Sequence, residues 1–186
     1  VLDLDHQRNT SQPLIRGGRV KLADFTSSQV LLGHVAPLPE APFALVQGDE
    51  PLSALERQPE KHNAMLNALK AFLDTAAATF DVCIIDTNPN PDIRYAAALI
   101  TCNFVLSPVQ LNQEALDGIS TLLVHQRYGL HKIKKAINPA LDFIGILPNL
   151  VEPTPFQRAS STSLRSPHHG SRLHRHISPR LLPSSL

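Results

Sequence analysis

The chain has 186 residues, of which 42% are hydrophobic and 18% are charged, and its formal net charge is +1. This length and composition predict one globular domain and exclude a chain that is disordered throughout. No stretch approaches the roughly 18 consecutive apolar residues of a membrane-spanning helix. Two cysteines are too few for a disulfide framework.

Short apolar runs alternate with helical periodicity along the first 156 residues. Five runs rich in Val, Ile and Leu are predicted as strands, at 1–5, 43–47, 81–86, 103–109 and 142–149. Apolar residues at three- and four-residue spacing predict helices at 61–80, 92–101 and 113–128. Because the runs are continuously apolar, we expect an α/β fold with a mostly parallel sheet and helices on both faces.

The third apolar run carries two further expectations. Cys83, Ile84 and Ile85 lie in the middle of this run. A strand covered on both faces buries its central side chains. We therefore expect a buried Cys83 thiol and two buried isoleucines.

The last thirty residues differ from the rest in composition. Periodicity stops after Phe156, and residues 157–186 contain eight Ser, five Arg, four His, three Pro and no acidic residue. Such a composition predicts a disordered basic tail. We therefore expect a domain over 1–156 and a tail over 157–186 that is foreign to it, as a frameshift, an assembly error or a pseudogene would produce. A genuine basic tail is the alternative.

Acidic residues follow the predicted strands. In an open parallel sheet, ligands bind at the carboxyl ends of the strands, which here carry Asp3, Asp5, Asp86 and Asn149. An apolar strand that ends in Asp, as at Asp86, is the Walker B pattern, whose carboxylate holds Mg²⁺ beside a triphosphate. An Asp that only caps a loop or helix is the alternative. None of the eight glycines is followed by Lys, so the sequence contains no phosphate-binding loop.

Five segments, in chain order, resemble the motifs of ParA-type partition ATPases. They are VLDLDHQRNT at 1–10 (hhDxDPQGNxT in the family), FDVCIIDTNP at 80–89 (YDxIIIDTPP), AAALITCNFVLSPVQ at 96–110, EALDGI at 114–119 and GILPN at 145–149. The resemblance implies a P-loop NTPase-like fold that uses ATP and Mg²⁺. It covers residues 1–156 and leaves the tail unmatched.

The resemblance also implies a role for each matching residue. Asp5 corresponds to the catalytic Asp that positions the hydrolytic water and senses the γ-phosphate. Asp86 and Asp3 correspond to the residues at the Mg²⁺ ion, and Asn149 to the Asn that binds adenine.

Several residues depart from the family pattern. His6 replaces Pro and Arg8 replaces Gly in the DxDPQGN segment. Asn88 replaces the Pro that follows the Walker B Thr, and Asn90-Pro91 replaces the usual Ser-Leu. These changes retain the acidic residues but put the geometry of the loop after Asp5 in question.

The family's phosphate-binding segment, KGGxGKT, lies upstream of the DxDPQ strand. We therefore expect that this chain is a fragment, truncated at both ends, and that it has no ATPase activity as written.

The resemblance implies a cytoplasmic, nucleoid-associated protein without a membrane anchor. Its expected partners are a ParB-like centromere-binding protein, nonspecific DNA and a second copy in an ATP-dependent homodimer. One alternative is a membrane-cycling relative of the MinD type, which needs a C-terminal amphipathic helix that Pro179 and Pro183 would break. The other is a non-catalytic remnant that acts only as an interaction module.

Overall fold

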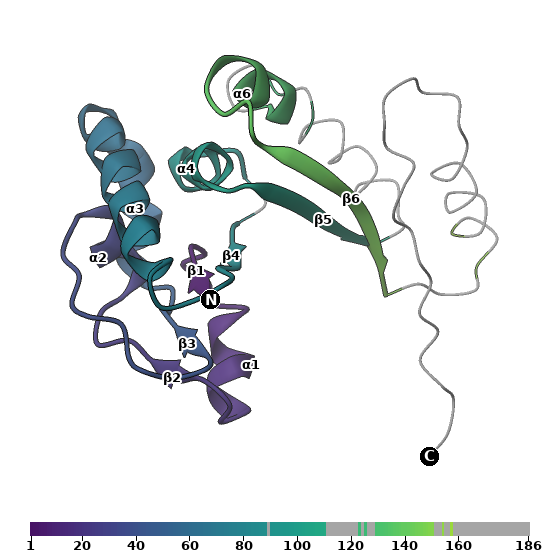
Figure 1. The fold of residues 1–186 in the computed structure, drawn as a ribbon. Coiled ribbons are helices and arrows are strands. Elements are labelled where there is room, and N and C mark those ends of the chain that lie inside the picture. The colour runs from purple at the N-terminus through teal and green to yellow at the C-terminus, as the bar shows by residue number, and fades with distance from the viewer. Residues whose placement is uncertain are drawn as a thin grey trace. The chain divides into compact units, whose positions relative to one another are not determined.

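The computed structural model describes residues 1–88, 90–110 and 129–150, together with 123, 125, 154 and 157. The chain forms two compact units, Val1–Thr101 and Cys102–Leu186 (Figure 1). Every strand pair among the described residues is parallel. Together with the intervening helices, this confirms the predicted α/β fold.

The first unit contains short strands and several helices. Its strands are β1 (Leu2–Asp3), β2 (Lys21–Leu22), β3 (Ala44–Leu45) and β4 (Ile85–Asp86). Its helices are α1 (Ser11–Arg16), α2 (Ser27–Leu31), the 3-10 helices η1 (Glu50–Arg57) and η2 (Pro59–Lys61), α3 (His62–Ala76) and α4 (Ile93–Thr101).

Strand β1 lies between β4 and the end of β3. Leu2 pairs with Ile85 in β4, and a parallel bridge joins Leu2 to Val46 on the other side. The backbone N–H of Leu4 donates to the carbonyl of Asp86 over 2.8 Å, which extends the β1–β4 ladder past Asp3. These bonds align the carboxyl ends of β1 and β4.

The core of the first unit lies between its strands and α2, α3 and η1. Leu4, Val30, Leu52 and Leu69 are each 0% exposed. The rings of Phe25 and Phe72 meet edge to face, with their centroids 6.0 Å apart. Burial of each such leucine contributes about 1.5–3 kcal/mol, so this shared core holds the strands and helices of the unit together.

The described part of the second unit contains one long strand pair and one helix. They are β5 (Phe104–Gln110), α6 (Leu130–Ala136) and β6 (Asp142–Asn149). The β5–β6 register runs from Phe104 opposite Asp142 to Gln110 opposite Asn149. The helix contributes buried Leu130 and Ile133.

The predicted helices at 61–80 and 92–101 correspond to α3 and α4. The predicted strands at 103–109 and 142–149 correspond to β5 and β6, whereas those at 1–5, 43–47 and 81–86 recur in shorter form as β1, β3 and β4. Residues 10–42, which gave no regular pattern, contain α1, β2 and α2. The predicted helix at 113–128 and the predicted tail lie outside the described residues, apart from single positions such as Gln157. No helix in the described ranges is long and apolar enough to cross a membrane.

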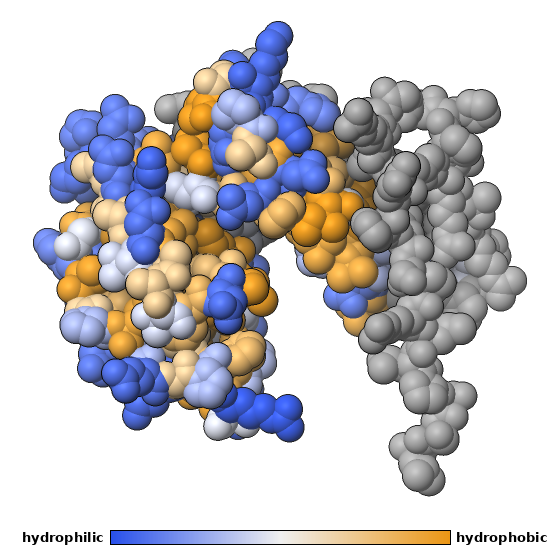
Figure 2. All heavy atoms as spheres, in the orientation of Figure 1, coloured by the Kyte–Doolittle hydropathy of each residue, from blue (hydrophilic) through white to orange (hydrophobic). Residues whose placement is uncertain are grey.

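The prediction of a buried run at 81–86 is largely wrong. Ile84 is 58% exposed and Cys83 is also exposed, whereas Ile85 packs against the core. The pairing of Leu2 with Ile85 puts those two side chains on the core face, so Ile84 points to the opposite face. Figure 2 shows apolar side chains at the surface among polar ones.

Candidate functional site

The ends of β1 and β4 bring carboxylates from distant parts of the sequence together. Asp3 pairs with Asp86 in the parallel register, and Asp5 lies two residues beyond Asp3 in the loop that follows β1. Three of the predicted site residues therefore meet at one end of the first unit's central strands. This is the end at which parallel sheets bind ligands.

The charges of these carboxylates act on one another. Burial raises the pKa of Asp86, and the neighbouring Asp3 and Asp5 raise it further, whereas a hydrogen bond from the Thr10 side chain lowers it. Partly buried carboxylates that repel one another form a site where a cation is favourable. The electrostatics of the site thus fit Mg²⁺, whose ligands are carboxylate, hydroxyl and water oxygens.

Asp3 closes the loop that carries Asp5. Its side chain is 0% exposed, and its Oδ1 accepts the backbone N–H of Asp5 over 3.0 Å. Its Oδ2 accepts the backbone N–H of Ser11 over 2.9 Å and the Ser11 hydroxyl over 2.6 Å. The carboxylate therefore spans the loop from residue 5 to residue 11, and any metal contact by Asp3 would add to these bonds.

The loop after β1 is a tight turn around Asp5. The Asp5 Oδ1 accepts the N–H of Gln7 over 3.1 Å, and the Asp5 carbonyl accepts the N–H of Arg8 over 3.1 Å. Arg8 has a φ of 59°, in the left-handed region that favours glycine. Arg8 occupies the position of the family's Gly, so the substitution retains the left-handed backbone.

Gly48, in the segment that follows β3, supports this loop. Its N–H donates to the Ser11 hydroxyl over 3.2 Å. A Cβ at this position would lie 2.2 Å from the carbonyl oxygen of Asp5, a distance that real side chains do not adopt. A glycine is thus required where the two backbones approach.

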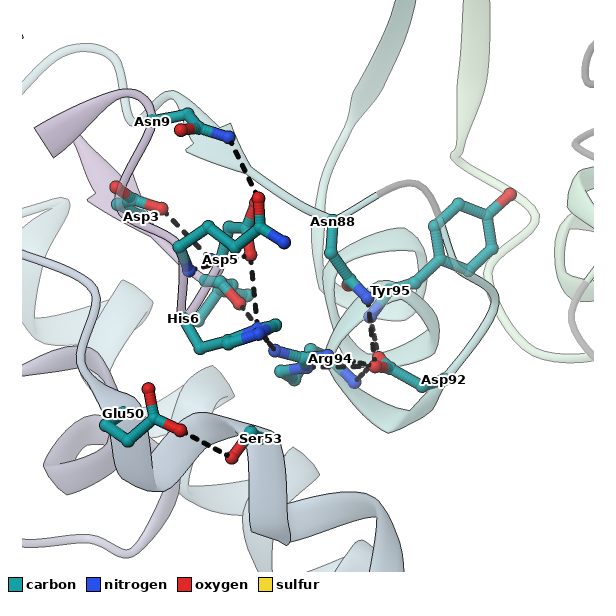
Figure 3. Close-up of polar contacts among 12 residues, drawn as sticks. Asp3, Asp5, His6, Asn9, Glu50, Ser53, Asn88, Asp92, Arg94 and Tyr95 are labelled. Atoms are coloured by element: carbon teal, nitrogen blue, oxygen red, sulfur yellow. Dashed lines mark hydrogen bonds and ion pairs between the residues drawn. The ribbon is translucent and has the colours of Figure 1, made fainter.

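A buried ion pair between Arg94 and Asp92 lies at the start of α4, beside the loop that carries Asp5 (Figure 3). Arg94 and Asp92 are 5% and 8% exposed. Asp92 Oδ1 caps α4 by accepting the N–H of Arg94 over 2.9 Å, and its Oδ2 accepts the side-chain N–H of Asn88 over 3.1 Å. Asn88, which replaces the family's Pro, is therefore built into the cap of α4.

Sequence reasoning missed Thr10, Ser11, Gly48 and Arg94. Thr10 and Ser11 follow the first acidic motif directly, so their hydroxyls could have been considered as partners of its carboxylates. Gly48 follows a predicted strand, which is a recognisable signal for close backbone approach. Nothing in the sequence marks Arg94, because a charged side chain in the first turn of a helix is ordinarily exposed.

Asn149 belongs to the second unit. It ends β6 opposite Gln110, and its side chain is exposed. A polar side chain at the carboxyl end of a parallel strand is free to contact a ligand. Its adenine contact stays a prediction.

The described residues contain no cluster of three His, Cys, Asp or Glu side chains that would hold a metal ion by themselves. Mg²⁺ in nucleotide sites is commonly held by one or two carboxylates, with phosphate and water oxygens completing the shell. The Asp3–Asp86 pair fits that arrangement rather than a metal site made entirely of protein ligands.

A family model described as an AAA domain, AAA_31, matches residues 1–143. This chain belongs to that family. The expected resemblance to ParA-type partition ATPases is confirmed by the family match together with the relatives.

A curated relative matches most of this chain. Protein IncC from Escherichia coli is 29% identical over 159 residues, which are 82% of this chain and 41% of IncC. The chain thus spans less than half the length of that relative.

Two solved structures share the fold. A cobyrinic acid a,c-diamide synthase from Mycobacterium smegmatis, with bound ADP and magnesium, has a TM-score of 0.71 at 25% identity, over 87% of this chain and 66% of that one. A plasmid partition protein from Borrelia burgdorferi has a TM-score of 0.65 at 17% identity, over 89% of this chain and 71% of that one.

Proposed function

We propose that the chain is the Mg²⁺- and water-handling part of a ParA-like ATPase that acts in plasmid or chromosome partition. The observation that carries the proposal is the pairing of Asp3 with Asp86, with Asp5 held beside them in a closed loop. This arrangement provides carboxylates where a metal–triphosphate complex would lie. The fold and the nucleotide bound by a solved relative support it.

Each residue has a distinct proposed role. Asp86 would hold Mg²⁺, which when bound neutralises charge on the phosphates. Asp5 would orient the attacking water through its carboxylate. Asp3 would fix the Asp5 loop and face the metal shell, and Asn149 would bind adenine. Catalysis of this kind depends on positioning and charge stabilisation rather than on covalent chemistry.

The proposal includes the setting of the reaction. A cytoplasmic protein of this kind would form an ATP-dependent dimer on nonspecific DNA at the nucleoid and respond to a ParB-like partner. The match to IncC and the fold shared with a plasmid partition protein support this setting.

The chain as written is proposed to be inactive. None of its glycines is followed by Lys, so the triphosphate would lack the charge-assisted hydrogen bonds of a phosphate-binding loop. Each such bond contributes about 1.5–3 kcal/mol. Calorimetry with Mg²⁺–ATP should therefore detect no micromolar binding to this chain, and micromolar affinity would show that the chain is not an inactive fragment.

An extended chain tests the function itself. A family segment that contains KGGxGKT, with its strand and helix, is joined to Val1, and ATP hydrolysis is measured. We expect hydrolysis that Asp86→Asn lowers by about 100-fold or more, as loss of a group that stabilises transition-state charge does. Asp81→Asn is the matched control, because Asp81 is an exposed carboxylate in the same segment. Hydrolysis that survives Asp86→Asn would refute the assigned site, and an extended chain that binds no nucleotide would favour the interaction module.

A further inference from the structure

The buried guanidinium of Arg94 is fixed to the start of α4. Its Nε donates to Asp92 Oδ2 over 2.9 Å, and its Nη2 contacts the same oxygen. A buried cation requires such partners, because removal from water costs several kcal/mol per ion. Asp92 also caps α4 through its other oxygen, so the helix start and the Arg94 side chain form one rigid group.

The remaining guanidinium nitrogen reaches the loop that carries Asp5. Arg94 Nη1 lies 3.4 Å from the carbonyl oxygen of Leu4 and 3.5 Å from Nδ1 of His6. Leu4 and His6 are the residues directly before and after Asp5. His6 Nδ1 in turn lies 3.3 Å from Asp5 Oδ1 (Figure 3).

We propose that Arg94 is a positioning residue for Asp5. Its Nη1 donates to the backbone carbonyl directly before Asp5, and so couples the loop that carries the proposed water-orienting carboxylate to the helix that follows the Asp86 segment. The single Nδ1 of His6 bonds either Arg94 or Asp5, so the backbone contact carries the clamp. The relevance of this clamp to hydrolysis rests on the proposed function. The clamp itself is a property of the folded chain without nucleotide.

The alternative is a purely structural role, in which Arg94 only neutralises Asp92 and stabilises α4. The two roles differ in which amides they protect. The N–H of Asp5 donates to Asp3 Oδ1 and the N–H of Gln7 donates to Asp5 Oδ1, so both report on the loop. The N–H of Leu4 donates to the carbonyl of Asp86 and reports on the β1–β4 ladder.

Glu56 provides the matched control. Its Oε2 accepts the N–H of Ile93 over 2.7 Å, so this bond is made to the start of α4 and not to the Asp5 loop. Glu56→Ala therefore weakens the helix start while the guanidinium keeps its contacts to Leu4 and His6.

The experiment is amide hydrogen exchange by NMR on the full chain, with each rate expressed relative to the Leu4 amide. In Arg94→Met and in Arg94→Lys, the Asp5 and Gln7 amides should exchange about tenfold faster than in the parent, the effect of losing one hydrogen bond to a charged group. The Arg94→Lys variant removes the planar guanidinium, which a single ammonium group cannot replace. It also retains the buried positive charge, so it can be measured even if Arg94→Met does not fold. Glu56→Ala should leave both relative rates unchanged.

Unchanged relative rates in Arg94→Lys would overturn the proposal, as would equal acceleration in Glu56→Ala. Because no nucleotide is added, these outcomes are independent of the ATPase test. The exchange rates can contradict the clamp while the extended chain hydrolyses ATP, and they can support the clamp while the extended chain does not hydrolyse ATP.

Discussion

Arg8 holds a backbone conformation that its side chain disfavours. Its φ of 59° costs a residue with a Cβ roughly 1–2 kcal/mol, and the family's Gly would adopt it freely. Allowing for the greater entropy of glycine in the unfolded chain, we expect Arg8→Gly to raise the free energy of unfolding by about 0.5–1 kcal/mol. Urea denaturation measures this. Arg8→Ala keeps the Cβ and should give no such gain, so equal stabilisation by both variants would rule out backbone strain as the cause.

Asp86 is a carboxylate whose ionisation opposes folding. Burial and the charges of Asp3 and Asp5 raise its pKa above the ordinary value of an aspartate, so the folded state binds the proton more tightly than the unfolded state. Stability from this group is therefore full below the unfolded pKa and falls as the pH rises through the folded pKa. Asp86→Asn should accordingly raise the urea midpoint at pH 7 without Mg²⁺, and this gain should disappear below about pH 3.8. A lower midpoint at pH 7 would show that the charge is already compensated.

Helix α3 shows how one element supports the candidate site. Leu69 is 0% exposed, whereas Lys70 beside it is exposed. Leu69→Ala should lower the free energy of unfolding by about 2–5 kcal/mol, because it leaves a cavity under the strands. Lys70→Ala should change it by less than about 0.5 kcal/mol. Chemical denaturation followed by circular dichroism compares the two, and equal effects would place the core elsewhere.

The elements differ in how far the sequence could predict them. Helix α3 was predictable because its apolar residues recur over four turns. The ends of β1 and β4 were predictable because an acidic residue follows each apolar run. β2 has only two residues and α2 only five, so neither shows a period. The exposure of Ile84 depends on which face of β4 is covered, and a continuously apolar run carries no such information.

The candidate site was partly predictable for a similar reason. Asp3, Asp5 and Asp86 could be placed together because parallel strands share an end. Their partners could not, since Ser11 and Gly48 approach through the path of the loops. The burial of Arg94 depends on contacts with Leu4, 90 residues earlier in the chain.

At the scale of the molecule, the first unit has a hydrophobic core of its own. All residues of that core lie between Leu2 and Ala98. We therefore expect the fragment 1–101 to unfold cooperatively on its own, with protected amides at Leu4 and Val46. Hydrogen exchange on the fragment is the measurement, and loss of protection at both amides would show that the core needs residues beyond Thr101.

The order of synthesis has a consequence for the pairing of β1 with β4. Arg94 and Leu4 are 90 residues apart. Strand β1 therefore emerges from the ribosome before β4. At about 5–20 residues per second, β1 waits on the order of ten seconds for β4. During this time, its edge and its leucines are open to chaperones and to other nascent chains, so the site that would handle the nucleotide is among the last parts of this unit to form.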